Sequence, residues 1–294
     1  MTSRLTRRTL LFGGGAVALI GATGFAVDEG ALPGRSTLYR RLGLDGAAGV
    51  VPHTATGPLV SGTFVSQKRL EKTVGWSIAY PPGHTVGDRL PVVVTLHGFG
   101  GSHASAFDSR FRLDRFLAAA VRSGAAPFAI ASIDGGNTYW HRRTSGEDAG
   151  AMVTDEFVPL LASKGLDTRR IGLHGWSMGA YGALLLAGQM GAGRVAAVAS
   201  ESVAIWHTAD RATASAFDSP ADFATHTLYG RQHLLDGIAV RVDCGTGDGF
   251  FPNDRDYVAG FTARPAGGFE PGAHDSAYWR RMAPAQLAFL AAHL

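Results

Sequence analysis

Ser177 is the residue of this 294-residue chain best placed for nucleophilic chemistry. It lies in Gly-Trp-Ser-Met-Gly at 175–179, after the strand-like run 170–174 and before a stretch rich in Ala and Leu. A G-x-S-x-G turn that joins a strand to a helix forms a nucleophile elbow, which presents the serine hydroxyl at the edge of a parallel sheet. The glycines let neighbouring backbone pack against this strained turn. The pattern therefore predicts Ser177 as a nucleophile.

A similar pentapeptide at 75–79 provides a contrast within the same chain. Gly-Trp-Ser-Ile-Ala lacks the closing glycine and continues into a strand-like stretch. Because the chain contains 40 glycines, the bare pattern is a weak signal, and the flanking elements decide between the two copies. We therefore interpret Ser77 as a structural residue.

A serine nucleophile needs a histidine base, and His274 is the best candidate. In sheets of this type the chain order is serine, then acid, then histidine. His274 lies on a Gly/Pro turn that leads into the last helix-like stretch, whereas His293 lies inside that stretch and His233 comes too early. The order therefore predicts His274 as the general base.

The acid that orients the base should follow the last buried strand. Asp248 is the first carboxylate after the run 238–244. A buried carboxylate there would accept the imidazole N–H, fix the tautomer and stabilise the imidazolium. Asp254 and Asp256 are rivals that we interpret as helix-capping or surface charges, and Asp243 lies within the strand.

Two backbone N–H groups are candidates for an oxyanion hole, which must hold donors toward the developing negative charge. One belongs to Met178, the residue after the nucleophile. The other belongs to Phe99 in His-Gly-Phe-Gly-Gly at 97–101, a glycine-rich loop upstream of the elbow. The alternative interpretation of this loop is a turn that only connects a strand to a helix.

The elements around these residues predict an α/β fold with a doubly wound, mostly parallel sheet. Runs that are continuously apolar and β-branched are typical of strands buried on both faces, and they alternate with helix-like stretches. The first two strands follow one another without a helix, so we expect an antiparallel pair at one edge. The expected strands are 61–66, 75–80, 91–96, 128–133, 170–174, 195–200 and 238–244, and the expected helices are 107–123, 149–164, 179–189 and 283–294.

An irregular interval at 201–237 interrupts this alternation between the sixth and seventh strands. It contains several aromatic and histidine side chains, among them Trp206, His207 and His226. Sheets of this kind often carry a cap over the active site at this point. We predict a small cap-like excursion, with a helical surface excursion as the alternative.

The chain resembles the α/β-hydrolase superfamily, and within it the esterase branch of S-formylglutathione hydrolases (esterase D) and mycobacterial mycolyltransferases. The resemblance covers about 63–294. Its motifs lie at 97–101, 133–136, 139–140, 155–156, 175–179, 244–248, 272–274 and 278–279.

The resemblance implies roles for individual residues. Ser177, Asp248 and His274 would form a catalytic triad, and Phe99 and Met178 would supply the oxyanion donors. Asp134 and Trp140 would border the pocket. The substrate-binding residues that we expect are His97, Gly98, Asp134, Trp140 and Trp176.

The first 27 residues are predicted to be a targeting segment. Arg4, Arg7 and Arg8 precede the uncharged run 10–27, and Thr-Arg-Arg-Thr-Leu-Leu at 6–11 resembles a bacterial twin-arginine export signal. An ordinary signal peptide or an uncleaved anchor, which would associate the protein with the membrane, are the alternatives. We therefore expect export to the cell envelope or medium, a linker at 28–57, and an α/β-hydrolase domain at 58–294.

Composition narrows the remaining function classes. A formal net charge of +3 and the lack of a basic stripe with interleaved aromatics argue against a nucleic-acid partner. The 11 histidines include no H-E-x-x-H or paired ligand spacing, so we expect no metal and no other cofactor. The single cysteine, Cys244, excludes an intramolecular disulfide and is interpreted as a small buried hydrophobe.

The function predicted from these observations is an exported serine carboxylesterase that acts on a small-molecule or lipid ester through an acyl-enzyme on Ser177. An exported protein has little access to cytosolic glutathione, which disfavours formaldehyde detoxification. One alternative is an acyltransferase of the mycolyltransferase type, in which a sugar or lipid hydroxyl replaces water. The other is a catalytically silent envelope-binding protein. The sequence does not indicate an oligomeric state.

Overall fold

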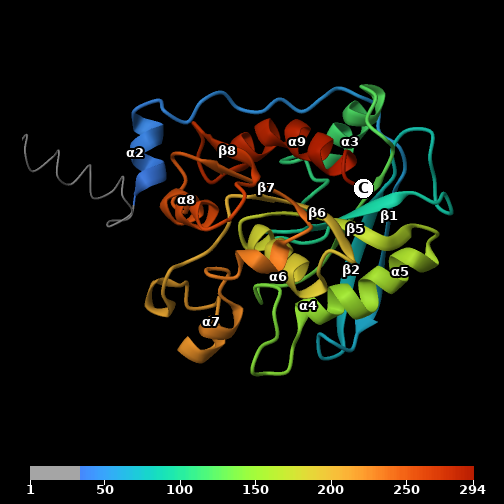
Figure 1. Cartoon of the computed structure of the whole chain (residues 1–294). Helices are drawn as coiled ribbons and strands as arrows, with labels where there is room; N and C mark the ends of the chain where they lie inside the picture. Colours follow the sequence, from blue (N-terminus) through green and yellow to red (C-terminus); the bar gives the residue numbers. More distant parts are fainter. Residues whose placement is uncertain (1–33) are drawn as a thin grey trace, which may run out of the picture.

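The computed structural model of the chain describes residues 34–294. They form an eight-stranded sheet in the order β1-β2-β4-β3-β5-β6-β7-β8, with helices on both faces (Figure 1). The predicted targeting segment 1–27 and any membrane association through it lie outside the described residues. Within 34–294, none of the helices combines the length and apolar character needed to cross a bilayer.

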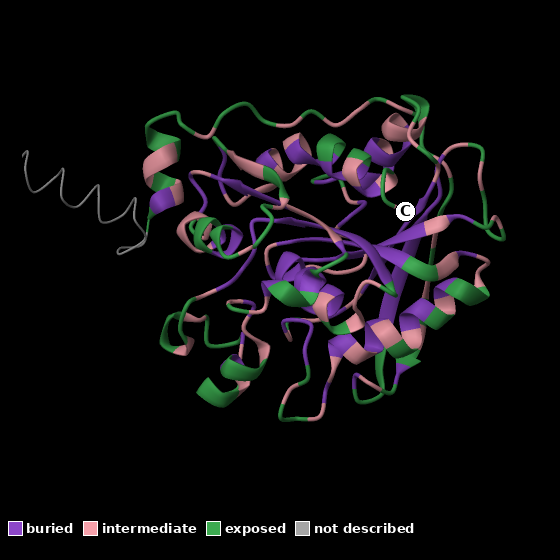
Figure 2. Cartoon of the chain, viewed as in Figure 1, coloured by how far each residue is buried: buried purple, intermediate pink, exposed green. Residues whose placement is uncertain are grey.

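The sheet is mostly parallel, as predicted. Strands β3 to β8 pair in parallel, and β1 and β2 form an antiparallel pair at one edge, where β2 joins β4. The central strands are almost wholly buried (Figure 2), which explains their continuous apolar sequences. The strands are β1 Leu59–Ser66, β2 Lys72–Ala79, β3 Pro91–Leu96, β4 Ala129–Ile133, β5 Asp167–Trp176, β6 Val195–Glu201, β7 Ala239–Gly245 and β8 Ala266–Glu270.

The helices divide into two layers around the sheet. Helices α3 and α9 contact each other on one face, while α4, α5 and α6 lie on the other (Figure 1). The helices are α2 Arg35–Arg41, α3 Leu113–Arg122, α4 Ala149–Met152, α5 Val158–Ser163, α6 Met178–Met190, α7 Pro220–His226, α8 Phe251–Ala259 and α9 Ser276–Ala291. A π-helical turn, Val153–Phe157, joins α4 to α5, and short 3-10 helices lie at Ala209–Arg211 and Gln232–Leu235.

Side chains along β3 show how one strand serves both layers. Successive side chains of a strand point to opposite faces. Val93 therefore packs in the apolar cluster under α3 and α9, while Val92 and Val94 pack in the cluster under α6. This alternation lets the sheet pack between the helical layers. The parallel pairing of β3, β5, β6 and β7 brings their carboxyl ends to one edge, where the candidate residues follow.

Outside the excursion 201–237, three elements of the described chain were not predicted. Strand β8 has the sequence Ala-Gly-Gly-Phe-Glu and is partly exposed at the sheet edge, so it has no apolar run. Helix α2 contains few apolar residues, and α8 directly follows a glycine-rich turn. Two predicted helices also differ at their start: α3 begins at Leu113, and α9 begins at Ser276 because Asp275 caps it.

The segment 34–57, predicted as a linker, contains α2 and then a chain without regular structure that runs along α9 toward α3 (Figure 1). Backbone and side-chain bonds hold it there. The Gly49 N–H donates to Ala277 O at 2.8 Å, and Arg115 donates to Pro52 O at 3.4 Å. These bonds hold the segment against the domain at Gly49 and Pro52.

Candidate active site

Ser177 occupies a strained turn between β5 and α6. Its φ of 57° and ψ of −123° lie outside the regions that L-residues ordinarily adopt. A Cβ on Gly175 would collide with the backbone of Gly179, and a Cβ on Gly179 would collide with the carbonyl of Leu96. Both glycines of the G-x-S-x-G pattern are therefore required by close backbone contacts, and the turn presents Ser177 at the sheet edge.

Ser177, His274 and Asp248 form a continuous chain of hydrogen bonds. The Ser177 hydroxyl donates to Nε2 of His274 at 2.9 Å, and Nδ1–H of His274 donates to Oδ2 of Asp248 at 2.8 Å. Ser177 follows β5, Asp248 follows β7, and His274 lies between β8 and α9. These three segments, far apart in the chain, meet at the carboxyl edge of the sheet.

Asp248 is fully buried but remains the favoured site of negative charge. Burial opposes ionisation, yet the charge and hydrogen bond of His274 outweigh it, and the pKa of Asp248 lies below its ordinary value. The Phe250 N–H donates to Oδ1 at 2.9 Å, and the Ser202 hydroxyl adds a further hydrogen bond. The carboxylate is thus held ionised against the imidazole.

The pKa of His274 is shifted in the opposite direction to that of Asp248. Burial lowers the pKa of its imidazole, but the adjacent Asp248 carboxylate raises it more, so that the pKa lies above its ordinary value of 6.5. A histidine with Nδ1–H fixed on a carboxylate presents an unprotonated Nε2 to the serine. The arrangement has the geometry that a general base requires.

The rival carboxylates have other partners. Asp254 is fully buried in α8, where its Oδ2 accepts the Val203 N–H at 2.9 Å, and burial raises its pKa well above the ordinary value. Asp256 contacts His207 at 3.3 Å, and Asp243 accepts from Arg241 at 2.7 Å. Of the four carboxylates weighed from the sequence, Asp248 is the one bonded to His274.

The two predicted oxyanion donors, Phe99 and Met178, belong to segments next to Ser177. Met178 is the first residue of α6, so its N–H has no acceptor within the helix. Phe99 lies in the loop after β3, which is fixed where Gly100 N donates to Asn137 Oδ1 at 2.7 Å. Gly98 lies so close to the nucleophile that a Cβ on it would be 3.4 Å from Cβ of Ser177. The loop 97–101 and the start of α6 thus both lie next to Ser177, and the roles of Phe99 and Met178 as oxyanion donors stay a prediction.

Three of the residues expected to bind substrate, His97, Trp140 and Asp134, lie around the loop 97–101. His97 is fully buried, with Nδ1–H donating to Gly98 O at 2.8 Å and Nε2 accepting the Gly135 N–H at 3.0 Å. Trp140 is also buried and packs edge-on against the His97 ring at 5.1 Å. Burial lowers the pKa of His97, which keeps the ring neutral, as this pair of hydrogen bonds requires.

Asp134, the third of them, binds backbone. Its carboxylate accepts the Gly75 N–H at 2.8 Å and the His103 N–H at 2.6 Å. These bonds tie the loop after β4 to β2 and to the segment after the glycine-rich loop. His97 and Asp134 thus bind backbone groups, Trp140 packs its ring against His97, and none of the three lines the cavity. Their contact with substrate stays a prediction.

A cavity of about 450 Å³ opens beside Ser177. Gly98 and Trp176, the other two expected substrate-binding residues, lie in its wall. Phenylalanine and tryptophan rings are among its lining residues. The lining residues are Gly98, Phe99, Gly100, Gly101, Ser105, Asp108, Arg110, Phe111, Trp176, Ser177, His274, Asp275, Ser276 and Trp279.

The excursion 201–237 contributes no residue to this cavity within the described part of the chain. It approaches the site from the side of His274. Trp206 packs edge-on against Phe250 at 5.5 Å, and Phe250 lies 5.4 Å from the His274 ring. The excursion therefore supports the base, and its role as a cap stays a prediction.

Ser202 is a site residue that the sequence analysis missed. It directly follows β6, has a positive φ of 53°, and bonds both Asp248 and the Trp279 indole. Its position at the carboxyl end of a buried strand was a usable signal. A separate group away from the cavity, His141, Asp222 and His226, has the ligand atoms for a metal ion, although the sequence analysis expected none.

Comparison with known proteins identifies the relatives of this chain. A family model, "Esterase" (described as "Putative esterase"), matches residues 67–290. No curated protein sequence matches the chain.

Among solved structures, a ferulic acid esterase is similar with a TM-score of 0.70 and 19% identity, covering 81% of this chain and 99% of that one. A mutant of the feruloyl esterase module from Clostridium thermocellum, complexed with sinapinate, has a TM-score of 0.63 and 15% identity, covering 84% and 96%. An S-formylglutathione hydrolase from Staphylococcus aureus has a TM-score of 0.63 and 15% identity, covering 79% and 98%. At these identities the structural likeness establishes the shared fold.

Proposed function

Because this chain belongs to the Esterase family, we propose that it is a serine carboxylesterase that works through an acyl-enzyme on Ser177. The observation that carries the proposal is the hydrogen-bonded chain from Asp248 through His274 to Ser177 at the wall of a cavity. A serine so bonded loses its proton to the imidazole as it attacks, which removes the main barrier to its use as a nucleophile.

The proposed reaction has two halves. Ser177 Oγ attacks the ester carbonyl carbon while Nε2 of His274 takes its proton. The tetrahedral intermediate collapses as the bond to the alcohol oxygen breaks and His274 returns the proton to that oxygen. Water then attacks the acyl-enzyme, gives its proton to His274, and releases the carboxylic acid as the proton returns to Ser177. Asp248 stays ionised throughout and stabilises the imidazolium in both halves.

The N–H groups of Phe99 and Met178 are the proposed donors to the oxyanion. The loss of one such donor typically lowers kcat by about 10²- to 10³-fold, so the position of the Phe99 loop matters. The bonds of His97 and Asp134 to backbone groups support this role, because they hold the loop in place without occupying the cavity.

We propose an aromatic acyl group as the preferred substrate. The rings of Phe111, Trp176 and Trp279 lie in the cavity wall, and Trp176 contacts Phe111 edge-on at 5.0 Å. Aromatic rings favour edge-to-face or offset contact with another ring. The structural neighbours named as ferulic acid and feruloyl esterases agree with this choice.

We also propose that the enzyme is exported through the twin-arginine route. The support is the sequence alone: Arg7 and Arg8 precede an uncharged run in the first 27 residues. An exported esterase would act on esters outside the cytoplasm. Fractionation of cells that express the full chain tests this location.

Labelling with a fluorophosphonate tests the nucleophile. The probe should form one adduct, on the peptide that contains Ser177, and Ser177→Ala should lose both labelling and ester hydrolysis, the latter by about 10⁴-fold or more. Ser77→Ala is the matched control, because the Ser77 hydroxyl also bonds a histidine, His103, at 2.8 Å but lies buried within β2. Labelling that persists in Ser177→Ala would refute the assignment.

A panel of esters tests the proposed acyl preference and separates hydrolysis from acyl transfer. Methyl ferulate should give a higher kcat/KM than p-nitrophenyl esters of long linear acids if the aromatic wall selects the acyl group. Adding a sugar acceptor should leave the rate of acid release unchanged for a hydrolase. Transfer of the acyl group to the sugar at the expense of hydrolysis would identify an acyltransferase instead.

A further inference from the structure

The glycine-rich turn after β3 uses its backbone N–H groups in different ways. Gly101 N donates to Gly98 O at 3.0 Å, and Gly100 N donates to Oδ1 of Asn137 at 2.7 Å. The N–H of Phe99 has no acceptor among the described residues. Phe99 therefore keeps its N–H available for a ligand, as the proposed oxyanion donor must.

The geometry of this turn makes Gly100 the position at which the loop can change shape. The bond from Gly101 to Gly98 closes a β-turn with Phe99 and Gly100 at its centre, and the positive φ of 72° at Gly100 is not shared by Phe99. This pattern is typical of a type II turn. Because glycine also adopts negative φ at little cost, the same residues could form a type I turn, in which the central peptide is rotated by roughly 180°.

Asn137 contacts this central peptide from a separate segment. Its side-chain oxygen accepts the Gly100 N–H, a bond that is lost when the peptide rotates to the other form. On the other side of Phe99, Nε2 of His97 accepts the Gly135 N–H at 3.0 Å. The Phe99 N–H thus lies between two hydrogen bonds, and both join the turn to the loop after β4.

The backbone of the loop after β4 is strained where it packs against this turn. Tyr139 and Trp140 have φ values of 55° and 58°, which are unfavourable for bulky side chains. Such backbone persists only where surrounding contacts enforce it, and it is common at functional sites. The Trp140 ring packs against His97 at 5.1 Å, and the Tyr139 ring lies 6.5 Å from that of Phe99. The strained residues therefore contact the same turn that Asn137 bonds.

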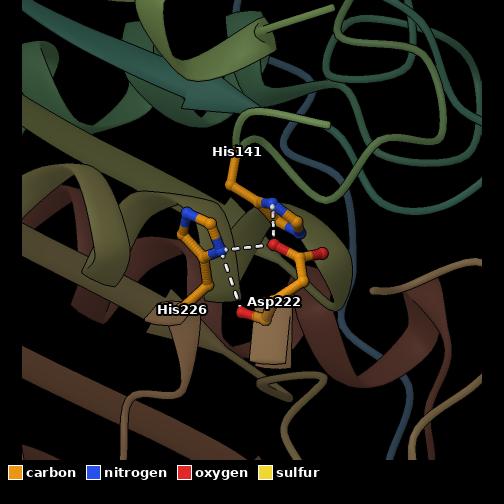
Figure 3. Close-up of side chains that lie close together, drawn as sticks. All are labelled: His141, Asp222 and His226. Carbon is orange, nitrogen blue, oxygen red and sulfur yellow. Dashed lines mark hydrogen bonds and ion pairs between the residues drawn. The ribbon is translucent and has the colours of Figure 1, made fainter. Parts of the chain in front are cut away.

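Contacts at both ends hold the loop 134–141 in place. At its start, Nη1 of Arg69 donates to Asp134 O at 2.8 Å. At its far end, the His141 ring stacks on the His226 ring of α7, with 4.3 Å between the ring centres (Figure 3). Because the loop is held on both sides of Asn137, the amide of this residue has a fixed place from which to orient the turn.

We propose that Asn137 is a positioning residue for the oxyanion hole. Its amide oxygen fixes the Phe99–Gly100 peptide, so that the Phe99 N–H stays directed at the oxyanion formed from the ester carbonyl. Asn137 does not line the cavity, so it acts through the backbone and not on the substrate. A donor that is held in place before the reaction stabilises the oxyanion without reorganisation. The inference rests on the proposed function, since it takes Ser177 as nucleophile and Phe99 as donor.

Hydrolysis of p-nitrophenyl acetate by Asn137→Ala tests the proposal. Loss of the acceptor should lower kcat by about 10- to 100-fold, because the charge to be stabilised develops only in the transition state. KM should change by less than about threefold. Asn137→Asp keeps an oxygen that can accept the Gly100 N–H, so its kcat should stay within about threefold of the wild type.

Inhibition by phenyl trifluoromethyl ketone provides a second readout, which a merely structural role would not move. Ser177 Oγ adds to the ketone carbon, its proton passes to Nε2 of His274, and the carbonyl oxygen becomes an oxyanion at the proposed donors. Because this adduct resembles the tetrahedral intermediate, Asn137→Ala should raise Ki by about the same factor as it lowers kcat/KM.

Thr138→Ala is the matched control from the same loop. The Thr138 hydroxyl donates to Gly135 O at 3.2 Å, so its bond stays within the loop and does not reach the glycine-rich turn. This variant should keep kcat and Ki within about twofold of the wild type. Circular dichroism and thermal melting establish that each variant is folded.

Three results would overturn the proposal. The first is an Asn137→Ala enzyme that hydrolyses the ester and binds the ketone like the wild type. The second is a loss of activity that Thr138→Ala shares, and the third is a loss that Asn137→Asp does not recover. A wild-type chain that hydrolyses no ester and is not labelled by a fluorophosphonate would instead refute the proposed function, and this inference with it.

Discussion

At the scale of single residues, His274 connects a buried carboxylate to a serine hydroxyl, and its protonation controls the proposed reaction. A base acts only when Nε2 is unprotonated, so kcat/KM should fall as the pH falls through the pKa of His274. Asp248 outweighs burial and raises that pKa, so the loss should begin above pH 6.5, the ordinary value. The pH profile of kcat/KM from 4 to 9 measures the midpoint.

Asp248→Asn provides the matched change at the same scale. It should lower kcat by about 10⁴-fold through the wrong tautomer and move the acid limb to lower pH. Asp254→Asn should keep the position of the acid limb, because Asp254 bonds Val203 and not His274. If the acid limb of the kcat/KM profile does not shift in Asp248→Asn, a group other than His274 controls the loss of activity at low pH.

Sequence order was sufficient to select Ser177, Asp248 and His274, because Ser177 and Asp248 each follow a strand with a readable apolar run and His274 lies on a Gly/Pro turn before the last helix. The roles of His97, Asp134 and Trp140 were not readable in this way. Whether a residue near a loop faces substrate or backbone depends on the packing of three separate loops, which no spacing encodes. The same reason hid Ser202, which acts on Asp248 from the end of a different strand.

At the scale of elements, the close approach of α6 to the end of β3 makes Gly179 a test of the elbow. A Cβ there would collide with Leu96 O, so Gly179→Ala should cost about 1–3 kcal/mol and reduce activity. Gly193→Ala should be nearly neutral, because no atom lies within 4 Å of its added Cβ. Urea unfolding measures both, and a neutral Gly179→Ala would contradict the packing described for the turn.

The elements that the sequence predicted are those whose burial leaves a periodic or continuous apolar pattern. Strands β3 to β7 are examples, since each is covered on both faces. Strand β8 and helices α2 and α8 lie at the periphery and bury few side chains. Their formation depends on tertiary contacts, which is why local composition did not reveal them.

At the scale of the whole molecule, α2 joins the amino-terminal segment to the loop that carries Asp248. Arg35 is buried, its Nε donates to Thr246 O at 2.6 Å, and its guanidinium lies 4.7 Å from the centre of the Phe251 ring. Arg35→Ala should therefore lower stability by about 2 kcal/mol and reduce kcat several-fold. Arg41→Ala, on an exposed part of the same helix, should change neither.

Thermal melting and ester kinetics on both arginine variants measure this effect. A stability loss of that size lowers the melting temperature of a domain of 150–250 residues by roughly 4–8 °C. If Arg35→Ala melts like the wild type, the amino-terminal segment does not hold the acid loop. The family model begins at residue 67, so family membership alone does not predict this contact.

Cys244 is a natural probe of local unfolding in β7. It is the single cysteine, it is fully buried in β7, and burial raises its pKa well above the ordinary value. A thiol reagent can therefore react only when β7 opens, four residues before Asp248. Labelling rates in native buffer would give the opening free energy of this strand without any engineered dye, and they would resolve whether a variant loosens the acid loop or the molecule as a whole.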